Sequence, residues 1–211
     1  MPKRDARNPA SAKGDWFIDD RCIDCAASRE VAPGLIVERG GKSIFARQPV
    51  TEDDTRAAWR AALLCPTASI GKEGRREQPP DLFPQELERG IYRCGYNARS
   101  SFGAHSYFIQ RKEGNVLIDS PRYVAKLVEA FERMGGLTDV LLSHQDDVSA
   151  AVVPKIGWPL RLRLSATSRR LLVFALRYVC PLRHFDDDRL GQADGGAIDD
   201  RRIALDHPVL L

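Results

Sequence analysis

Three cysteines, Cys22, Cys25 and Cys65, have the residue type and the spacing that most clearly indicate chemistry in this chain. Cys22 and Cys25 form a CxxC pair, whereas Cys65 lies far along the chain and is followed directly by Pro66. Thiolates are soft ligands that bind iron and zinc. A close pair on a tight turn can hold one face of an iron–sulfur cluster, and a distant Cys–Pro can close the opposite face. The spacing therefore predicts a metal site built from these three cysteines.

Ser28 is the main departure from the usual ligand pattern. Bacterial-type ferredoxins take three ligands from a CxxCxxC loop and a fourth from a distant Cys–Pro, and Ser28 occupies the third loop position. A hydroxyl is a weaker ligand for iron than a thiolate. The predicted cofactor is an iron–sulfur cluster, either 4Fe-4S with Ser28 at one corner or 3Fe-4S without that corner. The alternatives are a zinc site with a further ligand, a thioredoxin-like CxxC, and unligated buried thiols.

Short strands and one helix are expected to carry the cysteines. Gly40 and Gly41 supply the positive φ that a tight hairpin needs. Thr51 is the predicted N-cap of the helix, Asp54 completes a capping box, and Pro66 ends the helix. The expected strands cover residues 16–18, 35–39, 43–47 and 67–70. Both groups of cysteines therefore lie at the ends of regular elements.

A second set of elements delivers polar residues to the end of a strand. Strands are expected at residues 105–111, 115–119 and 140–142. Apolar residues recur at helical spacing over 123–134, and Gly135 and Gly136 end that helix. The last strand leads directly into Ser143, His144, Gln145, Asp146 and Asp147. A polar cluster at the end of a strand–helix–strand unit is typical of an α/β active site.

Composition divides the chain into segments. The first 151 residues contain ten Glu and six Lys, whereas the last 60 contain no Glu, one Lys and nine Arg. This shift suggests that the coding frame changed near Ala151 or Val152, so that the C-terminal part is truncated or frameshifted; a genuine helical extension is the alternative. The expected segments are a disordered tail at 1–14, a cluster-binding domain at 15–70, a linker at 71–81, a second domain at 82–151 and an anomalous tail at 152–211.

The chain resembles a known family over residues 15–151. The segments that carry the likeness are WFIDDRCIDCAASREVAPGLI, ARQPV, ALLCPTASIG, YNARSSFGAHSYFIQRKEGNVLIDSPR and MGGLTDVLLSHQDDV. They resemble bacterial and plant proteins in which a ferredoxin-like module precedes a metallo-β-lactamase-fold domain. The resemblance implies an α+β ferredoxin-like N-terminal domain followed by a partial α/β metallo-β-lactamase-like (αββα) domain. In that family the position of Ser28 is usually cysteine.

His144 and Asp146 are the candidate catalytic residues of the second domain. Hydrolases of the metallo-β-lactamase fold place an HxHxDH motif after a strand, where it binds the metals that activate water. Aligned on His144, this chain has Asp146 at the second histidine, Val148 at the aspartate and Ser149 at the last histidine. A zinc or iron ion in the second domain is therefore doubtful, although HQDD resembles the family's own HRDD variant. Asp119 resembles an aspartate of the fold that organises the metal loops.

Charge and hydropathy exclude several classes of partner. The net charge of +3, from 32 basic and 29 acidic residues, is too small to form a basic surface for nucleic acid or for an anionic membrane. No segment approaches the roughly 18 apolar residues of a membrane span, and the N-terminus lacks an apolar signal segment. We therefore expect a cytoplasmic protein whose five cysteines are thiols or ligands rather than disulfides. Cys94 and His105 are expected to have structural or surface roles.

Three functional hypotheses follow. The first is an iron–sulfur cluster-binding or electron-transfer module, acting with a redox partner protein that the sequence does not identify. The second is a metal-dependent hydrolase or oxidoreductase of the metallo-β-lactamase superfamily, with His144 and Asp146 at its site. The third is a non-functional truncated product. Metal content distinguishes the first hypothesis from the second.

Overall fold

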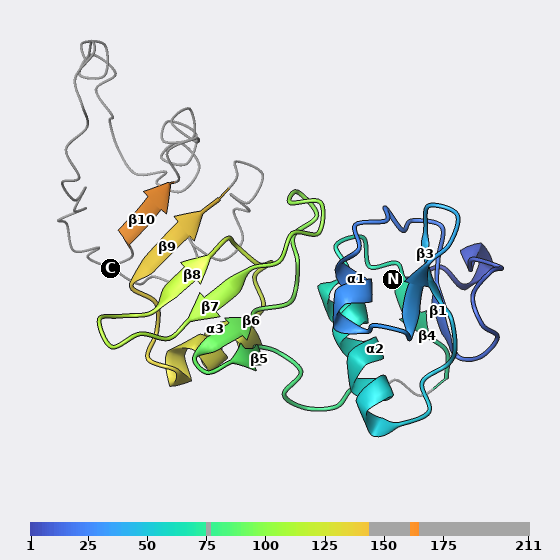
Figure 1. The fold of residues 1–211 in the computed structure, drawn as a ribbon, viewed down its shortest axis with the longest axis horizontal. Coiled ribbons are helices and arrows are strands. Elements are labelled where there is room, and N and C mark those ends of the chain that lie inside the picture. The colour runs from blue at the N-terminus through green and yellow to red at the C-terminus, as the bar shows by residue number, and fades with distance from the viewer. Residues whose placement is uncertain (75–76, 144–160, 165–211) are drawn as a thin grey trace, which may run out of the picture.

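The computed structural model describes residues 1–74, 77–143 and 161–164. Within these residues the chain forms two small two-stranded sheets, one six-stranded sheet and three α-helices (Figure 1). The small sheets and two helices are built from the N-terminal part of the chain, and the large sheet from the part that follows. The described residues are therefore α+β, as expected for the N-terminal part.

The two small sheets and two helices surround the first hydrophobic core. The strands are β1 (Trp16–Ile18), β2 (Ile36–Glu38), β3 (Ser43–Phe45) and β4 (Ile70–Lys72), and the helices are α1 (Ala27–Val31) and α2 (Glu52–Leu64). β1 pairs with β4 and β2 with β3, both antiparallel. The predicted strands at 16–18, 35–39 and 43–47 are confirmed, apart from their ends. Helix α1 was not anticipated, because it is only five residues long.

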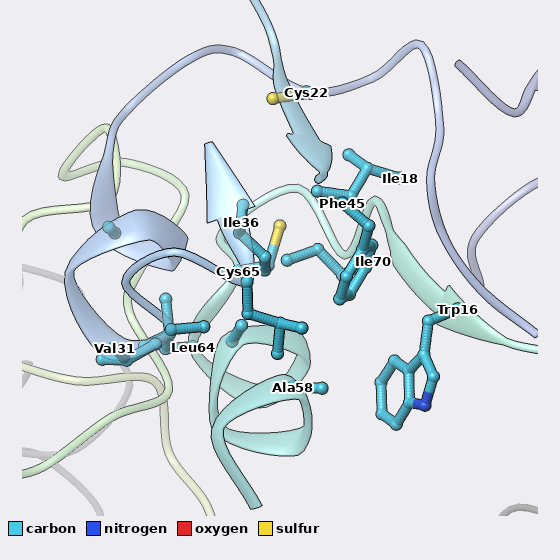
Figure 2. Packing of buried hydrophobic residues seen from close by; sticks show 14 residues of the cluster. Trp16, Ile18, Cys22, Val31, Ile36, Phe45, Ala58, Leu64, Cys65 and Ile70 are labelled. Carbon is cyan, nitrogen blue, oxygen red and sulfur yellow. The ribbon is translucent and has the colours of Figure 1, made fainter. Parts of the chain in front are cut away.

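Helix α2 follows the signals in its sequence. The Thr51 side chain accepts a hydrogen bond from the Asp54 amide at 3.0 Å, and the Asp54 carboxylate accepts one from the Thr51 amide, so the predicted capping box is confirmed. Ala58 and Leu64 are buried in the first core, and Figure 2 shows Leu64 beside Val31 of α1. Trp59 packs edge-on against Trp16, with ring centroids 5.1 Å apart. The capped helix thus holds one side of the core and ends immediately before Cys65.

The N-terminal segment differs from the expected disordered tail. It contains a short 3-10 helix, η1 (Arg4–Ala6), and its backbone bonds to neighbouring strands. The Asn8 amide donates to the Ile18 carbonyl at 2.9 Å, and the Ala12 amide donates to the Phe45 carbonyl at 2.8 Å. Strands at the edge of a sheet have carbonyl and amide groups without a strand partner. The N-terminal segment donates hydrogen bonds to two such carbonyls, those of Ile18 and Phe45.

The strand predicted at 67–70 is displaced in the structure. Residues 65–69 form a turn instead, in which Ala68 has a positive φ of 51° and its amide donates to the Cys65 carbonyl at 3.2 Å. Strand β4 starts only at Ile70 and continues into the residues predicted as a linker. The predicted boundaries between the cluster-binding domain, the linker, the second domain and the C-terminal tail stay predictions.

A six-stranded sheet follows. Its strands are β5 (Gln85–Glu88), β6 (Ile91–Arg93), β7 (Tyr107–Ile109), β8 (Val116–Ile118), β9 (Asp139–Leu142) and β10 (Arg161–Leu164). Their order is β10-β9-β8-β7-β6-β5, with antiparallel pairing from β5 to β8 and parallel pairing from β8 to β10. The predicted strands at 105–111 and 115–119 are confirmed with shorter bounds, and the strand predicted at 140–142 begins one residue earlier, at Asp139. Strands β5 and β6 were missed because neither sequence, QELE or IYR, alternates apolar and polar residues over a full strand.

Helix α3 (Ala125–Arg133) joins β8 to β9, so the predicted strand–helix–strand unit is confirmed. Phe131 of this helix stacks on Phe108 of β7, with ring centroids 4.8 Å apart, and both are fully buried in a second hydrophobic core. The Gly136 amide donates to the Phe131 carbonyl at 2.8 Å, and Gly136 has a positive φ of 71°. This is the glycine-ended helix that the sequence predicts.

Most of the anomalous segment 152–211, like His144 and Asp146, lies outside the described residues. Its only described part is β10, which pairs with β9. In the described part of the chain, no helix is long and apolar enough to cross a membrane.

Candidate metal centre

Cys22, Cys25, Ser28 and Cys65 line one small cavity at the edge of the first core. The remaining lining residues are Ile18, Ile23, Ser43, Thr67, Ser69 and Ile70. In Figure 2 the Cys65 sulfur points away from α2, toward the side on which Cys22 lies. The structure therefore brings together all four side chains that the spacing predicts for the site.

The loop that carries Cys22 and Cys25 is tightly wound. Asp24 and Ala26 both have positive φ, at 55° and 64°, which is uncommon for residues other than glycine. The Cys22 amide donates to the Asp19 carbonyl at 3.3 Å, and the Ala27 amide donates to the Cys25 carbonyl at 2.8 Å. These bonds close one turn that ends at Cys22 and another that begins at Cys25, and the second leads directly into α1.

Two sulfur atoms accept hydrogen bonds from the backbone. The Ser43 amide donates to Cys22 Sγ, and the Ser69 amide donates to Cys65 Sγ, each at 3.4 Å. The hydroxyls of Ser69 and Thr67 lie 3.3 and 3.5 Å from Cys65 Sγ. Hydrogen-bond donors therefore already surround two of the three predicted ligand sulfurs.

Arg21 joins the two ligand-bearing loops. Its guanidinium donates to the buried Asp19 carboxylate at 2.6 and 3.0 Å and to the Ala68 carbonyl at 2.8 Å. Asp19 precedes Cys22, and Ala68 belongs to the turn after Cys65. The pKa of Arg21 is raised, chiefly by its hydrogen bond to Asp19. A permanently charged group therefore fixes the spacing of the two loops.

Cys25 differs from the other two thiols in its surroundings. It is half-buried, and burial raises the pKa of its thiol. Gly103, from the connection between β6 and β7, lies directly against it. This neighbour comes from the second part of the chain, so a residue outside the N-terminal module packs against one of the predicted ligands.

The donor set fits an iron–sulfur cluster. A cluster takes one thiolate for each iron, so its ligands are spread around a volume rather than gathered on one ion. The three thiols and Ser28 are arranged around a cavity in this way. In residues 1–74 and 77–143, no three His, Cys, Asp or Glu side chains form a group that could hold one metal ion.

The described residues singled out in the second region do not line the cysteine cavity. His144 and Asp146 lie outside the described residues. Asp119 ends β8 with a positive φ of 56°, and its carboxylate accepts hydrogen bonds from the Ser143 amide at 2.7 Å and the Ser143 hydroxyl at 2.8 Å. It thereby fixes the backbone immediately before His144. Cys94 is fully buried in the second core, and burial raises its pKa to about 12, which agrees with a structural role.

His105 was expected to have no informative partner, and the structure gives it one. Its Nε2 lies 2.9 Å from Glu30 Oε2 of α1, although the two residues are 75 positions apart in the sequence. Burial lowers the pKa of His105, nearby Arg93 lowers it further, and Glu30 opposes both. No spacing rule links positions so distant, so neither this pair nor the neighbouring Gly103 could be found from the sequence.

The comparisons with known proteins agree with this geometry. Residues 18–72 match the family model of the 4Fe-4S single cluster domain of Ferredoxin I. The search of curated proteins found no match. The matched residues contain all three cysteines of the cavity and Ser28. The N-terminal part of this chain is therefore a ferredoxin-like module whose cofactor is an iron–sulfur cluster.

Proposed function

We propose that this chain is a single-cluster electron-transfer protein in which Cys22, Cys25 and Cys65 bind the cluster. The observation that carries the proposal is the convergence of these thiols and Ser28 on one cavity. When bound, an iron–sulfur cluster supplies reversible one-electron chemistry. The protein supplies the ligands, the hydrogen bonds to sulfur and the exclusion of water.

The backbone amides of Ser43 and Ser69 adjust the charge on the site. Their hydrogen bonds to Cys22 Sγ and Cys65 Sγ withdraw charge from the sulfur atoms. Reduction adds negative charge, so these donors favour the reduced form and raise the potential. The same amides hold the thiols in place before any metal binds.

Ser28 is proposed as the fourth ligand position. It lies in the first turn of α1, is buried and lines the cavity beside the thiols. Its oxygen is a harder and less acidic donor than sulfur. We therefore expect a cluster that loses its fourth iron readily and converts between the 4Fe-4S and 3Fe-4S forms.

The approach to the site also suits electron transfer. The side chain of Ile23, between the two cysteines of the CxxC pair, is 47% exposed although it lines the cavity. An apolar, exposed residue directly beside the ligands gives a redox partner a short route to the cluster. We propose that this face receives the partner protein.

A second candidate function concerns the region after the cluster module. Asp119 fixes Ser143 at the end of β9, immediately before His144 in the sequence. We propose as this second candidate a metallo-β-lactamase-like domain formed by β5 to β9 and α3, with His144 and Asp146 as its candidate metal or substrate contacts. A hydrolase would require zinc or iron bound in that region, separate from the cluster.

A redox titration of the full chain under argon tests the first proposal. Electron paramagnetic resonance spectra monitor the state of the cluster during the titration. We expect one reversible one-electron couple. Ser28→Cys should give a stable four-iron signal, and Ser28→Ala should give chiefly the three-iron signal. The absence of any reversible couple in protein that contains iron and sulfide would contradict electron transfer. Equal spectra for both variants would contradict the role of Ser28.

A further inference from the structure

The contact between Gly103 and Cys25 leaves no room for a side chain. A Cβ atom on Gly103 would lie 2.8 Å from Cys25 Sγ and 3.3 Å from Pro66 Cγ. Gly103 also has a φ of +93°, in a region that residues with side chains rarely adopt. Both observations require glycine here. The backbone of the second part of the chain thus approaches a cluster ligand as closely as packing allows.

The segment around Gly103 is fastened to the cluster module at both ends. At its start, Arg122 donates to the Asn97 carbonyl at 3.1 Å and to the Leu63 carbonyl near the end of α2 at 2.8 Å. At its end, His105 contacts Glu30 of α1 at 2.9 Å. Leu63 and Glu30 lie close in sequence to Cys65 and Ser28. The two attachments therefore hold the segment near α1, which contains Ser28, and near the end of α2, which Cys65 follows.

Asn97 fixes the segment internally. Its side chain is buried, and its Nδ2 donates to the Gly103 carbonyl at 2.6 Å and lies 3.2 Å from His105 Nδ1. The start, middle and end of the segment are thus joined through one amide. In Figure 1 the connection between β6 and β7 extends from the large sheet toward α1.

An open hollow borders this segment. Cys25, Glu30, Phe102, Gly103 and His105 are among its lining residues. Cys25 thus has the cluster cavity on one side and the hollow on the other. Movement of the segment away from α1 would widen an existing path for water to this thiol.

We propose that residues 97–105 form a cover loop that controls solvent access to the Cys25 corner of the cluster, with Gly103 as its positioning residue. The inference rests on the proposed cluster site but concerns a different part of the chain. It gives the second region a function in the redox module that does not depend on a hydrolytic site. Because water stabilises the more negatively charged reduced form, displacing the loop should raise the potential and expose the cluster to oxygen.

The first test measures the alkylation rate of each cysteine by N-ethylmaleimide in the full chain prepared without iron, using mass spectrometry. Gly103→Ala should increase the rate at Cys25 about five- to tenfold, in line with the loss of local attachments, and leave Cys22 unchanged. The matched control is Gly136→Ala. Gly136 also has a positive φ, but no atom of the described residues lies within 4 Å of the place that its Cβ would take.

A second variant tests the same loop in case Gly103→Ala does not fold. Arg122→Ala removes the attachment to Leu63 without placing any atom near Cys25, and Arg133→Ala on the exposed part of α3 is its control. In cluster-loaded protein, both loop variants should bleach faster in air and have a less negative potential than their controls. Unchanged Cys25 alkylation in folded Gly103→Ala and Arg122→Ala proteins would overturn the inference. Because alkylation is measured without iron, a failure to load a cluster would contradict the proposed function alone.

Discussion

The two hydrophobic cores of this molecule treat their buried polar groups differently. In the first, three thiols and Ser28 converge on a cavity, and backbone amides donate hydrogen bonds to two of the thiols. In the second, buried Asn115 donates to the carbonyls of Met134 and Gly136 at 3.0 and 2.8 Å, and Asp119 binds Ser143. Those groups hold loops together. Buried ligands that converge on a cavity indicate a binding site, whereas buried groups that bond to nearby backbone indicate structure.

The largest expected effect separates the thiols of the two cores. Replacing Cys22, Cys25 or Cys65 singly by alanine should remove most of the bound iron and sulfide, because each supplies a proposed ligand. Cys94→Ala is the control, since Cys94 is a buried thiol of the second core. It should retain the cluster and cost only about 1 kcal/mol in the free energy of unfolding. If only Cys94→Ala lost iron, the cluster would belong to the second core and not to the first.

The second prediction compares the cores themselves. Phe45 and Phe131 are both fully buried, one in each core. Truncation of either to alanine should cost about 3–5 kcal/mol in unfolding free energy, measured by urea denaturation. Only Phe45→Ala should also speed the loss of the cluster, followed by visible absorbance. If both variants released the cluster equally fast, the two cores would behave as one unit.

A smaller effect is expected at Asp119. Asp119→Ala removes two hydrogen bonds to Ser143 and should destabilise the second region by about 1–3 kcal/mol. Hydrogen exchange at β8 and β9 would measure the change. The iron content should stay at the wild-type value, because these bonds lie in the second core. Unchanged exchange at both strands would show that Asp119 does not organise this edge.

The smallest effect is a dependence of stability on pH. The hydrogen bond from Arg47 holds the pKa of Asp54 well below its usual range. A carboxylate with a lowered pKa stabilises the fold above its unfolded pKa, and this contribution is lost as the pH falls toward the folded value. The melting temperature of the wild type should therefore fall more steeply below about pH 4 than that of Asp54→Asn. Asp53→Asn, in the same turn of α2, is the control and should follow the wild type.

Local signals predicted much of the N-terminal module. The capping box at Thr51, the glycines at 40 and 41 and the Cys–Pro pair act within a few residues, so the sequence displays them directly. The pairing of β1 with β4 and the contact of His105 with Glu30 depend on packing between distant segments. The turn after Cys65 was mistaken for a strand because hydrogen bonds to the sulfur and the carbonyl of Cys65 determine its shape. These contacts become visible only in three dimensions.

The most direct test of the central claim is the content of iron, acid-labile sulfide and zinc per chain, measured on the full protein purified without oxygen. The account predicts about three or four irons with a similar number of sulfides, as clusters of this type contain, and little zinc. Zinc or iron without sulfide, or no metal after anaerobic reconstitution, would contradict it.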